Sequence, residues 1–128
     1  MEETIIQILS NHSSSNLGSG THKKDIRDLE VRLDITLPKD FKVYLLSLNY
    51  AELFGDPIFG INPEIKDIDL YTQNKEKEYF KYGFLHIFHS DIDGSVFLRP
   101  DTGAIYNSFF GAPVAKNLLD FITKVLNE

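Results

Sequence analysis

The spacing of apolar residues changes twice along this chain, and that change restricts the fold more than any other feature. Three stretches within the first 49 residues and one at the C-terminus carry apolar residues at helical spacing. Between them lie short apolar runs punctuated by glycine and proline, as is typical of strands and tight turns. We therefore predict an α+β fold, in which N-terminal helices and a C-terminal helix pack on a central antiparallel sheet.

The helical stretches have recognisable ends. The acidic start EETIIQIL predicts a short helix over residues 2–9. Thr21 is the expected cap of a second helix over residues 22–35. Pro38 is the expected first residue of a third helix, which ends near Asn49, a residue that tolerates the left-handed conformation of a helix end. The closing helix follows Asn117, a capping residue with Asp120 three positions later.

The central region predicts mainly strands. Residues 84–89, 95–99 and 104–109 are expected to form an antiparallel meander joined by glycine-containing turns. Two further short strands are expected around the sequences ELFG and PIFGI (residues 52–55 and 57–61). An irregular helix is predicted over residues 67–81.

Composition agrees with a single folded domain over residues 1–128. The chain is 42% hydrophobic and 12% aromatic, which is enough for a sizeable core. Residues 10–20, SNHSSSNLGSG, have the composition of a flexible loop. Cysteine is absent, which excludes disulfides and thiol catalysis. Because the acidic start lacks the features of a signal peptide and no apolar run reaches membrane-spanning length, we expect a cytoplasmic protein.

The sequence HSDIDGSVFLRP (residues 89–100) can be aligned with a twelve-position calcium loop through Gly94. The alignment places Pro100 where a bidentate carboxylate is required, and strand patterns rather than helices flank it. We interpret the sequence as a hairpin turn, in which Asp91 and Asp93 bond to nearby backbone and Gly94 takes a positive φ. No metal or cofactor is expected.

Catalytic motifs are also missing. His86 and His89 lie three residues apart on a predicted strand, so their side chains should point to opposite faces and share no ion. Ser90, next to His89, should point away from it and form no dyad. The sequence contains no nucleophile elbow and no phosphate-binding glycine loop. We therefore predict a protein that binds, not an enzyme.

Charge is distributed unevenly. The net charge of −6 argues against nucleic acid as a direct partner, because phosphate recognition needs clustered lysine and arginine. Residues 52–78 hold seven acids against three lysines, whereas residues 21–49 hold six bases and five acids. The acidic segment can steer a basic partner, or it can simply be a solvated surface that keeps the protein soluble.

The sequence IRDLEVRLDITLPKDFKVYLL (residues 26–46) resembles the opening of the SUKH superfamily, in which a helix leads to an LP-x-D-[YF] motif and a second helix. GFLHIF, SVFLR and DTGAIY resemble the strands of that family, and NLLDFITKVL resembles its terminal helix. The similarity spans about residues 22–127. It departs from the family at Tyr50, where glycine usually follows Asn49.

The resemblance implies function as well as fold. The superfamily includes fungal cell-wall-assembly regulators and bacterial immunity proteins that neutralise toxins, often nucleases or nucleic-acid deaminases. It has no catalytic residues to transfer. The resemblance thus implies an immunity protein that binds and occludes a cognate toxin domain, and we expect a toxin of the nuclease type. The acidic charge of the chain suits a basic toxin cleft, with aromatic anchors inside an acidic rim. The candidate contact residues are Glu52, Phe54, Asp56, Phe59, Asp67, Asp69, Tyr71, Asp91 and Asp93.

Two alternatives remain open from the sequence. One is a regulatory or scaffolding module that binds several intracellular proteins, the role that the fungal relatives suggest. The other is a small hydrolase with an unrecognised carboxylate site, which would require a concave pocket that holds a carboxylate of raised pKa.

Overall fold

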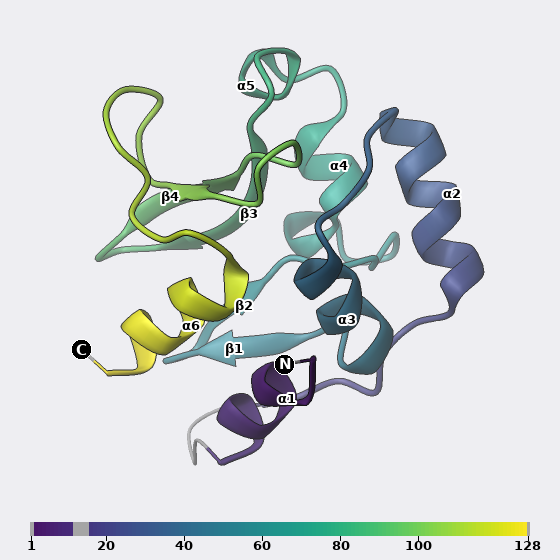
Figure 1. The fold of residues 1–128 in the computed structure, drawn as a ribbon. Coiled ribbons are helices and arrows are strands. Elements are labelled where there is room, and N and C mark those ends of the chain that lie inside the picture. Colours follow the sequence, from purple (N-terminus) through teal and green to yellow (C-terminus); the bar gives the residue numbers. More distant parts are fainter. Residues whose placement is uncertain (1, 12–15, 128) are drawn as a thin grey trace.

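The structure, a computed structural model, describes residues 2–11 and 16–127 (Figure 1). Within that part of the chain the elements follow in the order α1 (Glu2–Asn11), α2 (Lys23–Leu33), α3 (Lys39–Ser47), β1 (Ala51–Leu53), β2 (Asp56–Ile58), η1 (Lys66–Ile68), α4 (Leu70–Asn74), α5 (Glu78–Lys81), β3 (Leu85–Ser90), β4 (Gly94–Leu98), β5 (Ile105–Tyr106) and α6 (Leu118–Leu126). Helices at both ends flank a sheet, which confirms the predicted α+β fold.

The five strands form one sheet in the order β1-β2-β3-β4-β5, and every neighbouring pair is antiparallel. The predicted meander is therefore confirmed, although β5 ends at Tyr106 and does not continue to residue 109. Since β1 and β3 are both antiparallel to β2, they run in the same direction, as their arrowheads in Figure 1 show.

The main core lies between the sheet and the helices α1, α3 and α6, which pack against one another. Tyr44 of α3 is fully buried, and its hydroxyl donates a hydrogen bond of 2.9 Å to the carbonyl of Ile58 in β2. On α6, Phe121 meets the ring of Phe88 from β3 edge-on, with 5.7 Å between the ring centroids. The helix α2 packs outside this layer, on α3 and α4.

Local capping signals locate most helix ends. Asn117 accepts a 2.8 Å hydrogen bond from the amide of Asp120, and Asn49 takes the left-handed conformation after α3 with φ of 56°, both as predicted. The cap of α2 is His22, one residue later than predicted, because the Thr21 hydroxyl instead donates to the carboxylate of Asp25 at 2.9 Å. Pro38 is likewise the cap of α3, one position before the helix starts.

The predicted helix over residues 67–81 is divided into η1, α4 and α5. Asp69 ends η1 and caps α4, where its carboxylate accepts hydrogen bonds from the amide and the hydroxyl of Thr72 at 3.1 and 2.8 Å. The second break lies between α4 and α5, where Glu76 has a positive φ of 61°. A left-handed residue cannot continue a helix.

Backbone segments outside the strands cover both outer edges of the sheet. Ser10 and Asn11 of the predicted flexible loop belong to α1, and its residues 12–15 lie outside the described residues. Residues 16–18 of that loop lie along β1, where the amide of Gly18 donates to the carbonyl of Tyr50 at 2.8 Å. At the other edge, the amide of Ile105 in β5 donates to the carbonyl of Ala115 at 2.9 Å.

A β-bulge changes the orientation of side chains along β3. The pairing of β3 with β4 shifts register between His86 and Phe88, and the adjacent residues Ile87 and Phe88 are both buried. The extra residue brings His86 and His89 to the same face of the sheet, with 6.5 Å between their ring centroids. The prediction that these histidines point to opposite faces was therefore wrong.

Two buried asparagines hold the segment that leaves the sheet after β2. The side-chain amide of Asn74 donates to the carbonyls of Leu70 and His86 at 2.8 and 3.0 Å, and its oxygen accepts from the amide of His86 at 2.7 Å. The side chain of Asn49 bonds the backbone of Ile61 in the same way: its oxygen accepts from the amide of Ile61 at 2.8 Å, and its nitrogen donates to the carbonyl of Ile61 at 2.9 Å. Asn74 thus takes the place of a neighbouring strand beside β3.

We predict that Asn74→Leu lowers the free energy of unfolding by about 2–4 kcal/mol, because the backbone amide and carbonyl of His86 would remain buried without a partner. Urea denaturation measures this change. Gln73→Leu is the matched control, since its side chain donates only one exposed bond, to Lys66, and should cost less than about 1 kcal/mol. Equal costs for the two variants would contradict the role assigned to Asn74.

Candidate functional site

Two turns that are distant in sequence lie at one end of the sheet. The turn after β1 holds Phe54 and Gly55, and the turn after β3 holds residues 91–93. Because β1 and β3 run in the same direction, both turns project from the same end, on the left in Figure 1. We call the side chains gathered here the sheet-end surface. It consists of Glu52, Phe54, Asp56, Asp91, Ile92 and Asp93.

Apolar side chains are exposed at the centre of each turn. Phe54 is 55% exposed and Ile92 is 88% exposed. Phe54 also has a positive φ of 53°, followed by Gly55 at 89°, which is the geometry of a hairpin turn that normally carries asparagine and glycine. A bulky residue in this conformation costs about 1–2 kcal/mol. A backbone conformation of this cost at an exposed aromatic residue motivates the hypothesis of a function for this turn.

The carboxylate of Glu52 is fixed in place. It accepts a hydrogen bond of 2.8 Å from the side-chain amide of Asn16 and a second from the hydroxyl of Tyr50. The Tyr50 bond, followed by the Asn16 bond, lowers the pKa of Glu52, and the same contact with Glu52 raises the pKa of Tyr50 to about 12. Glu52 therefore presents a charged and oriented oxygen pair at neutral pH.

The turn at residues 91–93 is a hairpin turn, as predicted, and Gly94 has a positive φ of 68°. The bond that closes it differs from the prediction. The hydroxyl of Ser90 accepts from the amide of Asp93 at 2.9 Å and donates to the Asp93 carboxylate at 3.3 Å. The side chain of Asp91 is exposed. The side chain of Ser90 is 7% exposed and makes both of these hydrogen bonds within the turn. The ring of the neighbouring His89 instead contacts the hydroxyl of Ser95 at 3.2 Å.

The other predicted contact residues lie elsewhere. Asp69 is 4% exposed and is occupied as the cap of α4, and Phe59 is 5% exposed, with its ring 4.9 Å from that of His86. The ring of Tyr71 lies beneath the guanidinium of Arg32, at 3.8 Å. Asp67 is exposed on η1. The acidic segment over residues 52–78 is therefore divided, and its first part joins Asp91 and Asp93.

An aromatic cluster on the face opposite the main core was not predicted from the sequence. His86 lies against the rings of Phe59, Tyr79 and Phe97, at centroid distances of 4.9, 5.8 and 5.1 Å. Burial, followed by the nearby charges of His89 and Lys77, lowers the pKa of His86 to about 4. The bulge in β3 places His86 there, and the adjacent apolar pair Ile87-Phe88 between two histidines was the available signal.

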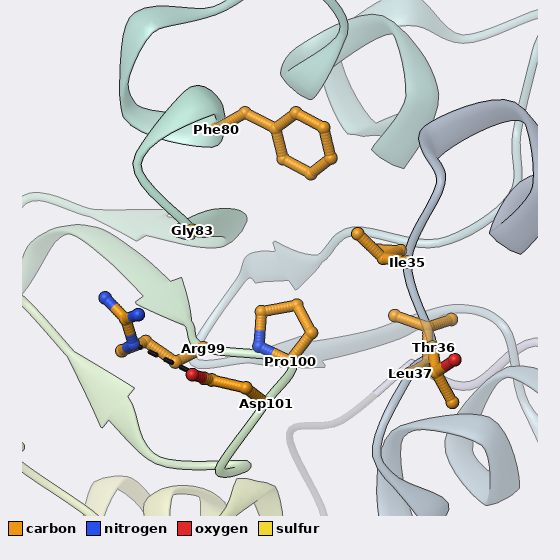
Figure 2. A pocket seen from close by; sticks show the side chains of 8 residues that line it. All are labelled: Ile35, Thr36, Leu37, Phe80, Gly83, Arg99, Pro100 and Asp101. Atoms are coloured by element: carbon orange, nitrogen blue, oxygen red, sulfur yellow. Dashed lines mark hydrogen bonds and ion pairs between the residues drawn. The ribbon is translucent and has the colours of Figure 1, made fainter.

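The pocket in Figure 2 has a volume of about 580 Å³ and lies between the α2–α3 connection, α5 and the β4–β5 turn. Ile35, Phe80 and Pro100 face its interior, while the guanidinium of Arg99 lies to one side, near Gly83. Arg99 pairs with Asp101 at 3.4 Å and lies over the ring of Phe84 at 5.0 Å. The charge of this arginine and that of Asp101 are thus already partnered with each other.

Other classes of site are also missing from the part of the chain that the structure describes. There, no three residues of the types His, Cys, Asp and Glu gather as metal ligands. No helix within residues 2–11 and 16–127 is long and apolar enough to cross a membrane.

We predict that acid destabilises the protein partly through His86. Its pKa of about 4 in the folded state lies below the ordinary value of 6.5, so between these values the unfolded chain binds more protons and stability falls as the pH falls. After allowance for partial screening, His86 should account for about 1 kcal/mol of the stability lost between about pH 7 and about pH 5.

Urea unfolding of His86→Phe at both pH values measures this contribution, because phenylalanine keeps the ring and removes the titration. His89→Phe, on the exposed side of the same face, is the matched control and should keep most of the acid sensitivity of the parent protein, because burial is the largest cause of the lowered pKa of His86. A parent protein and a His86→Phe variant with the same pH dependence would contradict the assignment.

Comparison with known proteins agrees with the observed order of elements. No curated protein sequence matches the chain significantly. The SMI1 / KNR4 family (SUKH-1) matches residues 20–124, a range that runs from the start of α2 into α6 and includes the whole sheet. The chain therefore belongs to the SMI1/KNR4 family of the SUKH superfamily.

Proposed function

We propose that this protein is an immunity protein that binds a cognate toxin domain and occludes it, and that the sheet-end surface makes the contact. Membership of the SUKH family is consistent with an immunity-type protein. The observation that supports the proposal is that the turns after β1 and β3 lie at the same end of the sheet, each with an exposed apolar side chain, Phe54 or Ile92, and with carboxylates nearby in the sequence. Exposed apolar side chains within a charged rim are the usual composition of a protein-binding site.

The charge of this surface indicates the chemistry of the toxin. Four carboxylates at one end of a chain with a net charge of −6 attract a basic surface and repel nucleic acid. A nuclease-type toxin domain has such a basic surface, because it must bind phosphates. Carboxylates placed over that cleft would take the position of phosphates and would also accelerate the encounter. Neither the occlusion of the cleft nor the faster encounter requires a catalytic group in this chain.

The charge is tested by the triple variant Asp56→Lys, Asp91→Lys and Asp93→Lys. The proposal predicts a toxin gene immediately beside this one. Association of the triple variant with the domain that this toxin gene encodes should slow by about 10- to 100-fold at low salt and should lose most of its salt dependence. Stopped-flow or surface-based kinetics at several salt concentrations measure both effects.

The control is the triple variant Glu64→Lys, Asp67→Lys and Glu76→Lys, which changes the net charge by the same amount at exposed positions outside the sheet-end surface. Equal slowing in both variants would mean that only net charge matters and would remove the proposed surface. Capture of several unrelated intracellular proteins with no toxin among them would instead favour a regulatory scaffold.

The position of Phe54 gives a second test. Phe54→Asn creates the asparagine-glycine pair that the turn favours, so the free energy of unfolding should rise by about 0.5–1 kcal/mol. The same change removes an exposed aromatic anchor and should weaken toxin binding by at least about tenfold. Val31→Asn, at a 79% exposed residue of α2, is the control and should leave binding unchanged. Retained affinity in Phe54→Asn would exclude Phe54 from the interface.

A further inference from the structure

A groove between α2 and α3 has the opposite electrostatic character to the sheet-end surface. Its volume is about 370 Å³, and the same spacing of i, i+3, i+4 and i+7 on both helices supplies its lining. The residues from α2 are Lys23, Ile26, Arg27 and Glu30, and those from α3 are Lys39, Lys42, Val43 and Leu46. We call this feature the α2–α3 groove.

The floor of the α2–α3 groove is apolar. Ile26 is buried at its base with 6% exposure, Val43 is half-buried, and Leu46 remains 40% exposed. The other apolar residues of α3, such as Phe41 and Leu45, point into the core and are fully buried. The groove therefore offers an open apolar contact of the size of one or two side chains.

The rim of the α2–α3 groove is cationic. Four of its lining residues are lysine or arginine and only one, Glu30, is acidic. Glu30 is already occupied, since it pairs with Lys42 at 3.3 Å and accepts the backbone amide of Leu37 at 2.8 Å. Lys23 and Arg27 are exposed, one turn apart on α2. This local excess of positive charge stands out in a chain with a net charge of −6.

We propose that the α2–α3 groove binds an acidic polypeptide segment that places one bulky apolar side chain between the two helices. Carboxylates of the segment would face Lys23 and Arg27, and its apolar side chain would cover Leu46 and Val43. This site is separate from the sheet-end surface and does not depend on the toxin-binding proposal.

Other occupants fit less well. A nucleic acid or an anionic membrane extends beyond a groove of this size and would meet the net negative charge of the rest of the chain. Phosphates also make no use of an apolar floor. A second copy could insert its own acidic sheet-end surface, but such a head-to-tail contact propagates into a closed ring or an open filament, whereas a separate segment needs only one copy of this chain. A separate acidic segment satisfies both the rim and the floor.

Fluorescence anisotropy with the full chain tests the proposal, with a panel of labelled acidic peptides that carry leucine, phenylalanine or tryptophan at the centre. We expect at least one to bind, and replacement of its central residue by serine should weaken binding about tenfold. The double variant Lys23→Glu and Arg27→Glu should also weaken binding about tenfold or more, since it exchanges two attractive contacts for repulsive ones.

The matched control is Lys66→Glu with Lys77→Glu, which makes the same change in charge at exposed lysines outside the groove and should alter affinity by less than about twofold. Circular dichroism verifies that both double variants remain folded. The proposal is overturned if no peptide of the panel binds up to millimolar concentration, if both double variants lose affinity equally, or if the serine peptide binds as well as its parent.

Three further measurements separate the alternative occupants. A labelled single-stranded oligonucleotide and vesicles that contain phosphatidylserine should not bind through the groove. Sedimentation of the free protein should show no self-association that Lys23→Glu with Arg27→Glu abolishes. A positive result in any of these measurements, together with weak peptide binding, would replace the acidic segment with that occupant and overturn the proposal.

Discussion

The side-chain amide of Asn74 makes the hydrogen bonds to the backbone of His86 that a neighbouring strand would otherwise make, and much of the architecture depends on this contact. The sheet pairing of β2 with β3 involves only a short stretch, because the chain leaves the sheet after Phe59. Without Asn74, the backbone of His86 would have no partner on that side of β3. The hydrogen-bonded amide of Asn74 fixes α4 against β3. A shift of α4 would break these hydrogen bonds, and a buried polar group without a partner lowers the stability of the fold. Asn49 holds the start of the same connection at Ile61.

These contacts explain how a long acidic segment becomes two separate surfaces. The turn at Phe54 and Gly55 remains at one end of the sheet, whereas Asn49 and Asn74 hold the segment over residues 60–74 to the end of α3 and to β3. The helix α4 of this segment packs on α2. Asp69 is therefore a structural residue, and Tyr71 is covered by Arg32 from a helix that lies 39 positions earlier. Acidic residues close in sequence are thus separated in space, and Asp56 is grouped with Asp91 and Asp93 instead.

Sequence patterns predicted the features that depend on neighbouring residues. The apolar stripe of α6, the cap at Asn117 and the left-handed Asn49 are local signals, and all three are observed. The bulge at His86 was missed because regular alternation was assumed along the whole strand, which places His86 and His89 on opposite faces. The adjacent apolar residues Ile87 and Phe88, both buried, were the local sign of an irregular strand. The burial of Phe59 and Asp69 depends on long-range partners, about which the local sequence gives no information.

The covered edges of the sheet limit how this protein can recognise anything. Many domains capture extended peptides by letting them add a further strand to a free sheet edge, so that the main chain supplies the affinity. Here β1 is already paired with the backbone of residues 16–18, and β5 with that of Val114 and Ala115. Strand addition at either edge would require one of these segments to be displaced. Recognition without such displacement must rely on side chains, which can be exchanged singly to change partners while the sheet stays the same.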